Sequence, residues 1–226
     1  MKLITVVGIG PGNIDYITKI AMDSISMSDI VVGGKRNIDV LKKIINNEKH
    51  NFILDKNDTI NRNNAMSEKS YYILDSNFSD LKQYILDNIK KDITVLASGD
   101  PSVYGIADYI ERAFSEMTEI NIISGISSIQ YAFSKVKLNM NNVYITSSHG
   151  REPNFDFIFL HDKIAMVTDS KIGPIEIAKE ILSRELDYTI YVCENLSYDD
   201  ENIIIGDANK ILQKCNYGMC VIILNR

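Results

Sequence analysis

The feature that most constrains this sequence is a regular alternation of short apolar segments with segments whose apolar residues recur at helical spacing. In the first half, strand-like segments lie at 3–7, 29–32, 71–74, 93–97 and 120–123, with one further short candidate at 52–54. The segments between them with apolar residues three or four apart are 17–25, 38–45, 78–89 and 104–115. Strands separated by helices are typical of βαβ units, so this half predicts a mostly parallel sheet.

The second half predicts a different sheet. Its strand-like segments are 143–146, 164–168, 189–193, 203–205 and 220–224, and its helical segments are 126–136, 174–185 and 208–214. The strands at 189–193 and 203–205 are too close together for a crossover helix, so they should pair antiparallel within a mixed sheet. We therefore predict a two-lobed α/β protein with domains at 1–124 and 125–226, and a solvated polar loop at 56–70.

Composition and charge exclude several classes of protein. The 226 residues are 45% hydrophobic and 24% charged, which is the range of globular proteins. The formal net charge of −6 argues against a nucleic-acid partner, because such proteins usually carry a basic face. The chain runs from Met1 directly into a strand-like segment and contains no apolar run of membrane-spanning length, which predicts a cytoplasmic protein without a membrane partner.

The cysteines and histidines predict neither a disulfide framework nor a metal site. Cys193, Cys215 and Cys220 are odd in number and lack CxxC spacing. The three histidines, among them His149 and His161, are too scattered for a zinc-binding motif.

A glycine-rich turn, Gly8-Ile9-Gly10-Pro11-Gly12, follows the first strand. Such a turn lets a ligand approach the backbone closely at the edge of the sheet where open α/β folds bind ligands. The turn does not match the GxGxxG motif of dinucleotide-binding proteins, because Asn13 stands where the last glycine is required and Pro11 lacks a backbone N–H. A tight turn without a ligand remains the alternative.

Two further polar turns follow strands later in the chain. Ser98-Gly99-Asp100-Pro101 offers a carboxylate acceptor for an amino group or a ribose hydroxyl, although this pattern also forms ordinary turns. Gly125-Ile126-Ser127-Ser128 opens a helix, where serines either cap the helix or hold a ligand. Ile129 replaces the last glycine of a GxSxG nucleophile motif and excludes it.

Taken together, the three turns resemble the tetrapyrrole methylase family, and the resemblance covers essentially the whole chain. Additional segments are similar to the branch of that family that methylates C-5 of the corrin ring of cobalt-precorrin-7 or precorrin-6Y in cobalamin synthesis. These segments are 31–36 (VVGGKR), 97–101 (ASGDP), 124–130 (SGISSIQ), 148–151 (SHGR) and 193–196 (CENL).

The resemblance implies a fold, a cofactor and site residues. Members of this family bind S-adenosyl-L-methionine as co-substrate in the cleft between their two lobes. Carried over to this sequence, the cofactor-binding residues are Pro11, Ser98, Gly99, Asp100, Val103, Ser127, Ser128, Val167, Asn195 and Leu196. The substrate carries many carboxylates, for which Gly10, Lys35, Arg36 and Arg151 are the candidate contacts; solvated surface charges are the alternative for the three cations.

The resemblance also implies a chemistry that needs little catalytic machinery. The sulfonium is already activated and the acceptor is an electron-rich ring carbon, so methyl transfer requires placement and exclusion of water more than a strong base. The catalytic residues are therefore unknown, with Asp100, Tyr104 and His149 as weak candidates for a general base. We further expect a homodimer and a separate polypeptide for any methylation and decarboxylation at C-15.

Three rival functions remain open at this point. The first is a methylase of the same fold that acts on another corrin position, on rRNA or on a translation factor. The second is a protein that binds a tetrapyrrole or S-adenosylmethionine without turnover. The third is a nucleotide-dependent oxidoreductase, against which the missing third glycine argues.

Overall fold

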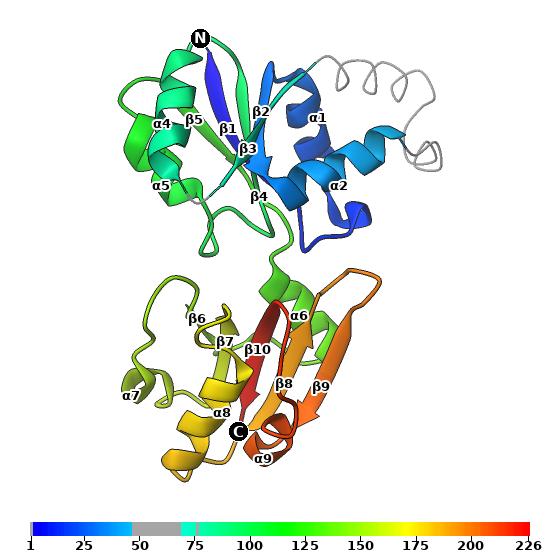
Figure 1. The fold of residues 1–226 in the computed structure, drawn as a ribbon, viewed down its shortest axis with the longest axis vertical. Helices are drawn as coiled ribbons and strands as arrows, with labels where there is room; N and C mark the ends of the chain where they lie inside the picture. Colours follow the sequence, from blue (N-terminus) through cyan, green and yellow to red (C-terminus); the bar gives the residue numbers. More distant parts are fainter. Residues whose placement is uncertain (1, 47–68, 76) are drawn as a thin grey trace. The chain divides into compact units, whose positions relative to one another are not determined.

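The structure is a computed structural model that describes residues 2–46, 69–75 and 77–226. The chain forms two compact units, Met1–Ser127 and Ser128–Arg226 (Figure 1). The predicted boundary between residues 124 and 125 lies shortly before this division. The predicted strand at 52–54 and most of the predicted loop at 56–70 lie outside the described residues.

The first unit contains a five-stranded sheet in which all strand pairings are parallel, as predicted. Along the sheet the strands lie in the order β3-β2-β4-β1-β5. They are β1 (Leu3–Gly8), β2 (Ile30–Gly34), β3 (Ser70–Leu74), β4 (Ile93–Ala97) and β5 (Glu119–Ile123).

Helices cover both faces of this sheet, which explains why its central strands β1 and β4 are buried along most of their length. The helices are α1 (Lys19–Met27), α2 (Lys35–Asn46), α4 (Phe78–Asp87) and α5 (Ala107–Phe114), with a short 3₁₀ turn at Ile14–Tyr16. Figure 1 shows α1 and α2 on one face and α4 and α5 on the other. Along β1 the side chains alternate accordingly: Val7 packs with α1 and α2, whereas Ile4 and Val6 pack with α4 and α5.

The neighbouring strands β1 and β4 send the chain in opposite directions. From β1 the chain passes through α1 to β2, and from the neighbouring β4 it passes through α5 to β5 on the opposite face. In open α/β sheets the crevice outside the carboxyl ends of such strands is the usual ligand site. The loops that follow β1 and β4 are therefore the first candidates for a site in this unit.

The second unit contains a mixed sheet in the order β6-β7-β10-β8-β9, which confirms the second part of the predicted fold class. Only β6 and β7 pair in parallel, and the other three pairings are antiparallel, including the predicted hairpin of β8 and β9. The strands are β6 (Tyr144–Ser147), β7 (Lys163–Val167), β8 (Thr189–Glu194), β9 (Asn202–Gly206) and β10 (Cys220–Asn225).

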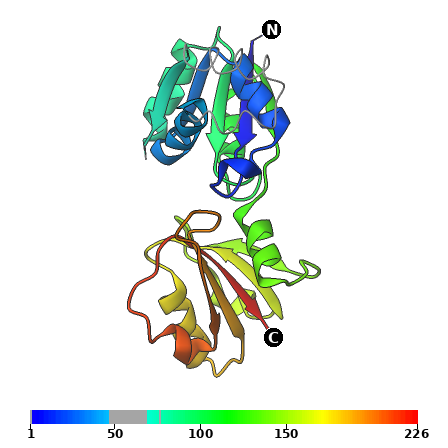
Figure 2. The same ribbon diagram turned by 90° about the vertical axis from the view of Figure 1, so that its right-hand side faces the viewer.

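Helices also cover both faces of the second sheet. Figure 2 shows α6 (Ser128–Val136) on one face and α8 (Pro174–Ser183) and α9 (Ala208–Ile211) on the other. Pro174 is the first residue of α8, where its missing N–H costs nothing. The short helix α7 (Phe155–Ile158) was not predicted, because a single turn capped by Asn154 has no periodic pattern to detect. No helix in the described parts of the chain combines the length and the hydropathy needed to cross a bilayer.

A buried carboxylate joins three segments of the second unit. Glu194, at the end of β8, is only 5% exposed. It accepts hydrogen bonds from Asn202 Nδ2 (3.0 Å), Lys214 Nζ (2.6 Å) and the Gly218 backbone N–H (2.8 Å). Burial alone raises the pKa of Glu194, but these three donors outweigh it and hold the pKa below its usual value.

We expect Glu194→Gln to lower the free energy of unfolding at pH 7 by about 2 kcal/mol, because one acceptor becomes a donor and Lys214 loses its counter-charge. Because folding lowers the pKa of Glu194, its contribution is present above the unfolded-state pKa and is lost as the pH falls through the folded-state pKa. Urea unfolding between pH 7 and pH 3 measures both effects. The exposed Glu111→Gln is the matched control; a variant that loses stability in parallel with the wild type below pH 5 would contradict this role.

Candidate functional site

Three loops of the first unit meet at glycines that leave no room for a side chain. Gly8 ends β1, Gly99 follows β4 and Gly125 follows β5. A Cβ atom on Gly8 would lie 2.5 Å from the Gly125 nitrogen and 2.6 Å from the Gly99 carbonyl oxygen. A Cβ atom on Gly125 would overlap the same Gly99 oxygen. The backbones at the carboxyl ends of β1, β4 and β5 are therefore in direct contact.

Backbone hydrogen bonds fix the loops after β1 and β4 to each other. The Gly10 N–H donates to the Gly99 carbonyl (3.2 Å), and the Gly99 N–H donates to the Gly10 carbonyl (2.7 Å). Both glycines have positive φ angles, 78° and 67°, which residues with a side chain rarely adopt. Pro11 follows directly and is buried. The predicted residues Gly10, Pro11 and Gly99 thus lie together at the switch point of the sheet.

Asp100 ties the loop after β4 to the loop after β5. Its Oδ1 accepts from the Ser102 N–H (2.8 Å) and its Oδ2 accepts from the Gly125 N–H (3.1 Å). An ionised carboxylate accepts about four hydrogen bonds, so acceptor positions remain for a ligand. Val103 closes the same turn by donating to the Asp100 carbonyl (3.2 Å). Tyr104 is exposed and has a φ angle of 52°, a strained conformation for an aromatic residue.

The two predicted cations after β2 have different surroundings. The Lys35 Nζ lies 4.0 Å from the Asp39 carboxylate, in an exposed pair of little energetic value. The Arg36 guanidinium donates to Ser98 Oγ (3.2 Å), and Ser98 Oγ donates to Asn37 Oδ1 (3.0 Å). The structure therefore brings a predicted substrate contact, Arg36, next to a predicted cofactor contact, Ser98. Asn37 was not predicted as a site residue. The only sequence signal for it is its position directly after the two cations.

The serines after β5 lie at the start of α6. Ser127 is buried and precedes the helix, and Ser128 is its first residue. The division between the two units falls between these residues. Their proposed contact with a cofactor stays a prediction.

In the second unit, an aspartate joins the loops after β6 and β7. Asp169 accepts hydrogen bonds from the backbone N–H groups of Gly150 (3.1 Å), Lys171 (2.8 Å) and Ile172 (3.0 Å). These bonds, the one from Ile172 first, lower the pKa of Asp169 to about 2. Asp169 was not predicted as a site residue from the sequence, although it follows a strand as Asp100 does.

The predicted residues His149, Arg151, Val167, Asn195 and Leu196 lie at strand ends or on loops at one edge of the second sheet. His149 and Arg151 are exposed on the loop after β6, which Asp169 fixes at Gly150. Val167 ends β7, and the Asn195 N–H donates to the Met219 carbonyl just before β10 (3.0 Å). Asn195 has a φ angle of 47°, which asparagine tolerates better than most residues, and Leu196 is buried beside it.

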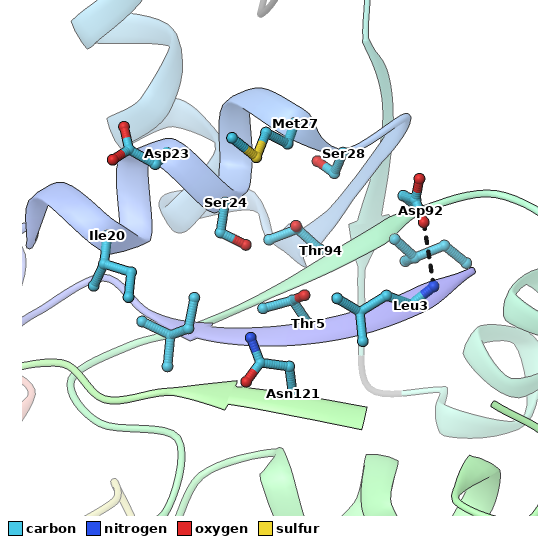
Figure 3. Close-up of a pocket in the computed structure, with 12 residues that line it drawn as sticks. Leu3, Thr5, Ile20, Asp23, Ser24, Met27, Ser28, Asp92, Thr94 and Asn121 are labelled. Atoms are coloured by element: carbon cyan, nitrogen blue, oxygen red, sulfur yellow. Dashed lines mark hydrogen bonds between the residues drawn. The ribbon is translucent and has the colours of Figure 1, made fainter. Parts of the chain in front are cut away.

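A separate groove of about 500 Å³ lies between α1 and β5 in the first unit (Figure 3). Its floor carries Thr5, Thr94 and Asn121, which lie in register on β1, β4 and β5, and its rim includes the exposed Ile20 and Met27 of α1. None of the predicted site residues lines it. Among the described residues, no cluster of three or more His, Cys, Asp or Glu side chains is arranged to hold a metal ion.

We expect Gly125→Ala to lower the free energy of unfolding by roughly 3 kcal/mol, because the added methyl group overlaps the Gly99 carbonyl and the surrounding atoms are backbone. Gly34→Ala is the matched control, since a Cβ atom there meets nothing within 4 Å. Chemical unfolding of both variants measures the difference. Equal stability of the two variants would show that the three loops are not closely packed.

Comparison with known proteins identifies relatives over nearly the whole chain. The profile of the tetrapyrrole (corrin/porphyrin) methylases matches residues 3–212. The cobalt-precorrin-7 C(5)-methyltransferase of Salmonella typhimurium is 33% identical over 202 residues, which cover 89% of each chain. The probable cobalt-precorrin-7 C(5)-methyltransferase of Methanocaldococcus jannaschii is 31% identical over 217 residues, 92% of this chain and 91% of the relative.

Solved structures share the fold. The precorrin-6Y methylase of Archaeoglobus fulgidus has a TM-score of 0.71 and 20% identity, covering 99% of this chain and 98% of that one. A uroporphyrin-III C-methyl transferase of Thermus thermophilus, solved with S-adenyl homocysteine, also has a TM-score of 0.71, at 13% identity and 99% and 97% coverage. With its parallel and mixed sheets and its full-length sequence relatives, the chain belongs to the tetrapyrrole (corrin/porphyrin) methylase family and is a C-methyltransferase.

Proposed function

We propose that this protein transfers a methyl group from S-adenosyl-L-methionine to C-5 of a cobalt-precorrin-7 type corrin in cobalamin synthesis. The observation that carries the proposal is the identity with two relatives of that named activity over about nine-tenths of each chain. Because both relatives are named for C-5 alone, we also assign any C-15 chemistry to a separate polypeptide. A homodimer and a cytoplasmic location are further proposals from the sequence and the family resemblance.

The residues at the carboxyl edge of the first sheet fit the proposed cofactor. S-adenosylmethionine carries an ammonium group, two ribose hydroxyls and an adenine amino group, all of which donate hydrogen bonds. The Asp100 carboxylate retains acceptor positions, and the glycines at 10 and 99 bring backbone to the same place. We therefore assign Pro11, Ser98, Gly99, Asp100 and Val103 to the cofactor. The predicted positions Ser127, Ser128, Val167, Asn195 and Leu196 remain predictions.

The contribution of these residues to the chemistry is placement. The bound sulfonium supplies an activated methyl group, so the chain has to align the donor with the ring carbon and keep water away. Two backbone N–H groups hold the Asp100 carboxylate in place, and Asp100 stays an untested candidate for a base. Tyr104 and His149 are both exposed in the structure and stay untested candidates for a base.

A methyl-transfer assay tests the proposal directly. Purified protein, labelled S-adenosylmethionine and late corrin intermediates with and without cobalt are combined, and mass spectrometry and NMR locate the new methyl group. We expect label at C-5 of one intermediate. Label at another ring position, or transfer only to rRNA or a protein acceptor, would refute the C-5 assignment while leaving the family membership intact.

We expect Arg36→Gln to raise the KM for the corrin about tenfold with little change in kcat, because a guanidinium binds substrate carboxylates that an amide binds weakly. The rise should shrink at high salt, since screening already weakens the wild-type contact. Arg112→Gln is the control, as Arg112 is exposed on α5 and pairs with Asp108. An unchanged KM at low salt would remove Arg36 from the substrate site.

A further inference from the structure

A chain of three side chains connects the buried Asn37, in the first turn of α2, to Arg36, an exposed cation at the proposed site. The Arg36 guanidinium donates to Ser98 Oγ at 3.2 Å, and Ser98 Oγ donates to Asn37 Oδ1 at 3.0 Å. Arg36 and Ser98 are exposed, whereas Asn37 is only 9% exposed. The chain therefore runs from a fixed end at Asn37 to a surface end at Arg36.

The direction of each hydrogen bond follows from the groups involved. A guanidinium has only donors, so the Ser98 oxygen must accept from Arg36. The single hydroxyl proton of Ser98 is then directed at an acceptor, and the Asn37 amide oxygen is that acceptor. With Asn37 in place, the Ser98 hydroxyl is held in one rotamer with its oxygen facing the guanidinium. Without Asn37, the hydroxyl proton loses its acceptor and the rotamer is no longer fixed.

Asn37 has to act on Arg36 through Ser98, because helix geometry keeps the side chains of Arg36 and Asn37 apart. Consecutive residues of a helix do not face each other, so Arg36 and Asn37 do not contact side by side on α2. Ser98 reaches both from the end of β4, across the edge of the sheet. Asn37 itself is held by the first turn of α2, whose next residue, Ile38, is fully buried in the core.

We propose that Asn37 is a positioning residue: through the Ser98 hydroxyl it holds the Arg36 guanidinium in the orientation that receives a carboxylate of the corrin substrate. This inference rests on the proposed function and adds a residue that the sequence patterns did not single out. An arginine held in one orientation loses less side-chain entropy when it binds a carboxylate. Asn37 therefore affects substrate affinity and leaves the methyl-transfer step unchanged.

The test compares Asn37→Leu, Ser98→Ala and the double variant at saturating S-adenosylmethionine. We expect Asn37→Leu to raise the KM for the corrin about three- to tenfold, with kcat within about twofold of the wild type. In the Ser98→Ala background the same substitution should have no further effect, because the connection to Arg36 is already broken. Asn88→Leu, which removes a side-chain hydrogen bond to the Tyr84 carbonyl in α4, is the matched control and should keep the wild-type KM.

Each other outcome overturns the inference. A merely structural role for Asn37 would lower the melting temperature without the KM change, or would lower kcat and kcat/KM together. Independent effects of Asn37→Leu and Ser98→Ala would show that Asn37 does not act through Ser98. If Asn37→Leu fails to fold, the smaller change Asn37→Ala takes its place in the same cycle with Ser98→Ala, and additive effects there would overturn the inference.

Direct binding separates this inference from the proposed function. Absorbance titration of the cobalt corrin in the presence of S-adenosylhomocysteine gives dissociation constants without turnover. If the wild type binds the corrin but methylates a position other than C-5, the proposed function fails and the ratio of dissociation constants still tests Asn37. Equal constants for the wild type and Asn37→Leu overturn the inference alone, and a wild type that binds no polycarboxylated corrin overturns both.

Discussion

The close approach of three backbone segments at Gly8, Gly99 and Gly125 is the constraint on which the first unit depends. Each glycine lies at or just after the carboxyl end of a parallel strand, and a Cβ atom on Gly8 or Gly125 would meet the backbone of the other two segments. Because the strands lie side by side in the order β4-β1-β5, the three loops have to leave the sheet together. At the switch point a ligand would therefore meet backbone atoms. The polar groups on these loops are held at defined positions relative to one another.

Both units stabilise their loops by the same device, an aspartate that accepts backbone N–H groups from two loops. Asp100 joins the loops after β4 and β5, and Asp169 joins the loops after β6 and β7. Loops at the carboxyl ends of parallel strands leave unpaired N–H groups, and a carboxylate satisfies several of them at once. The low pKa of Asp169, about 2, reflects this arrangement. Both carboxylates thus order the loops that follow the strands.

Much of the fold was predictable because strand and helix periodicity are local signals. The parallel first sheet, the mixed second sheet and the β8–β9 hairpin follow from the lengths of apolar segments and the distances between them. Of the candidate site, only the loops that carry it could be predicted from the sequence. The hydrogen bond of Ser98 to Asn37 and the bonds of Glu194 with Lys214 and Gly218 join different segments of the sequence. A pattern within one segment contains no information about such partners. Asp169 was missed because a single aspartate after a strand resembles an ordinary turn.

The rigidity of these loops agrees with what methyl transfer demands. When the donor is already activated, the barrier is lowered mainly by holding donor and acceptor in line, and an error of about 1 Å costs roughly 100-fold in rate. Loops of the first unit whose backbones touch and whose N–H groups are bound by Asp100 suit that requirement better than flexible loops would. Substrate recognition has a different requirement, since a macrocycle with several carboxylates is bound by exposed cations. Under the proposed assignment of Arg36 to the substrate, the hydrogen bond from its guanidinium to Ser98 Oγ links this exposed cation to the end of β4.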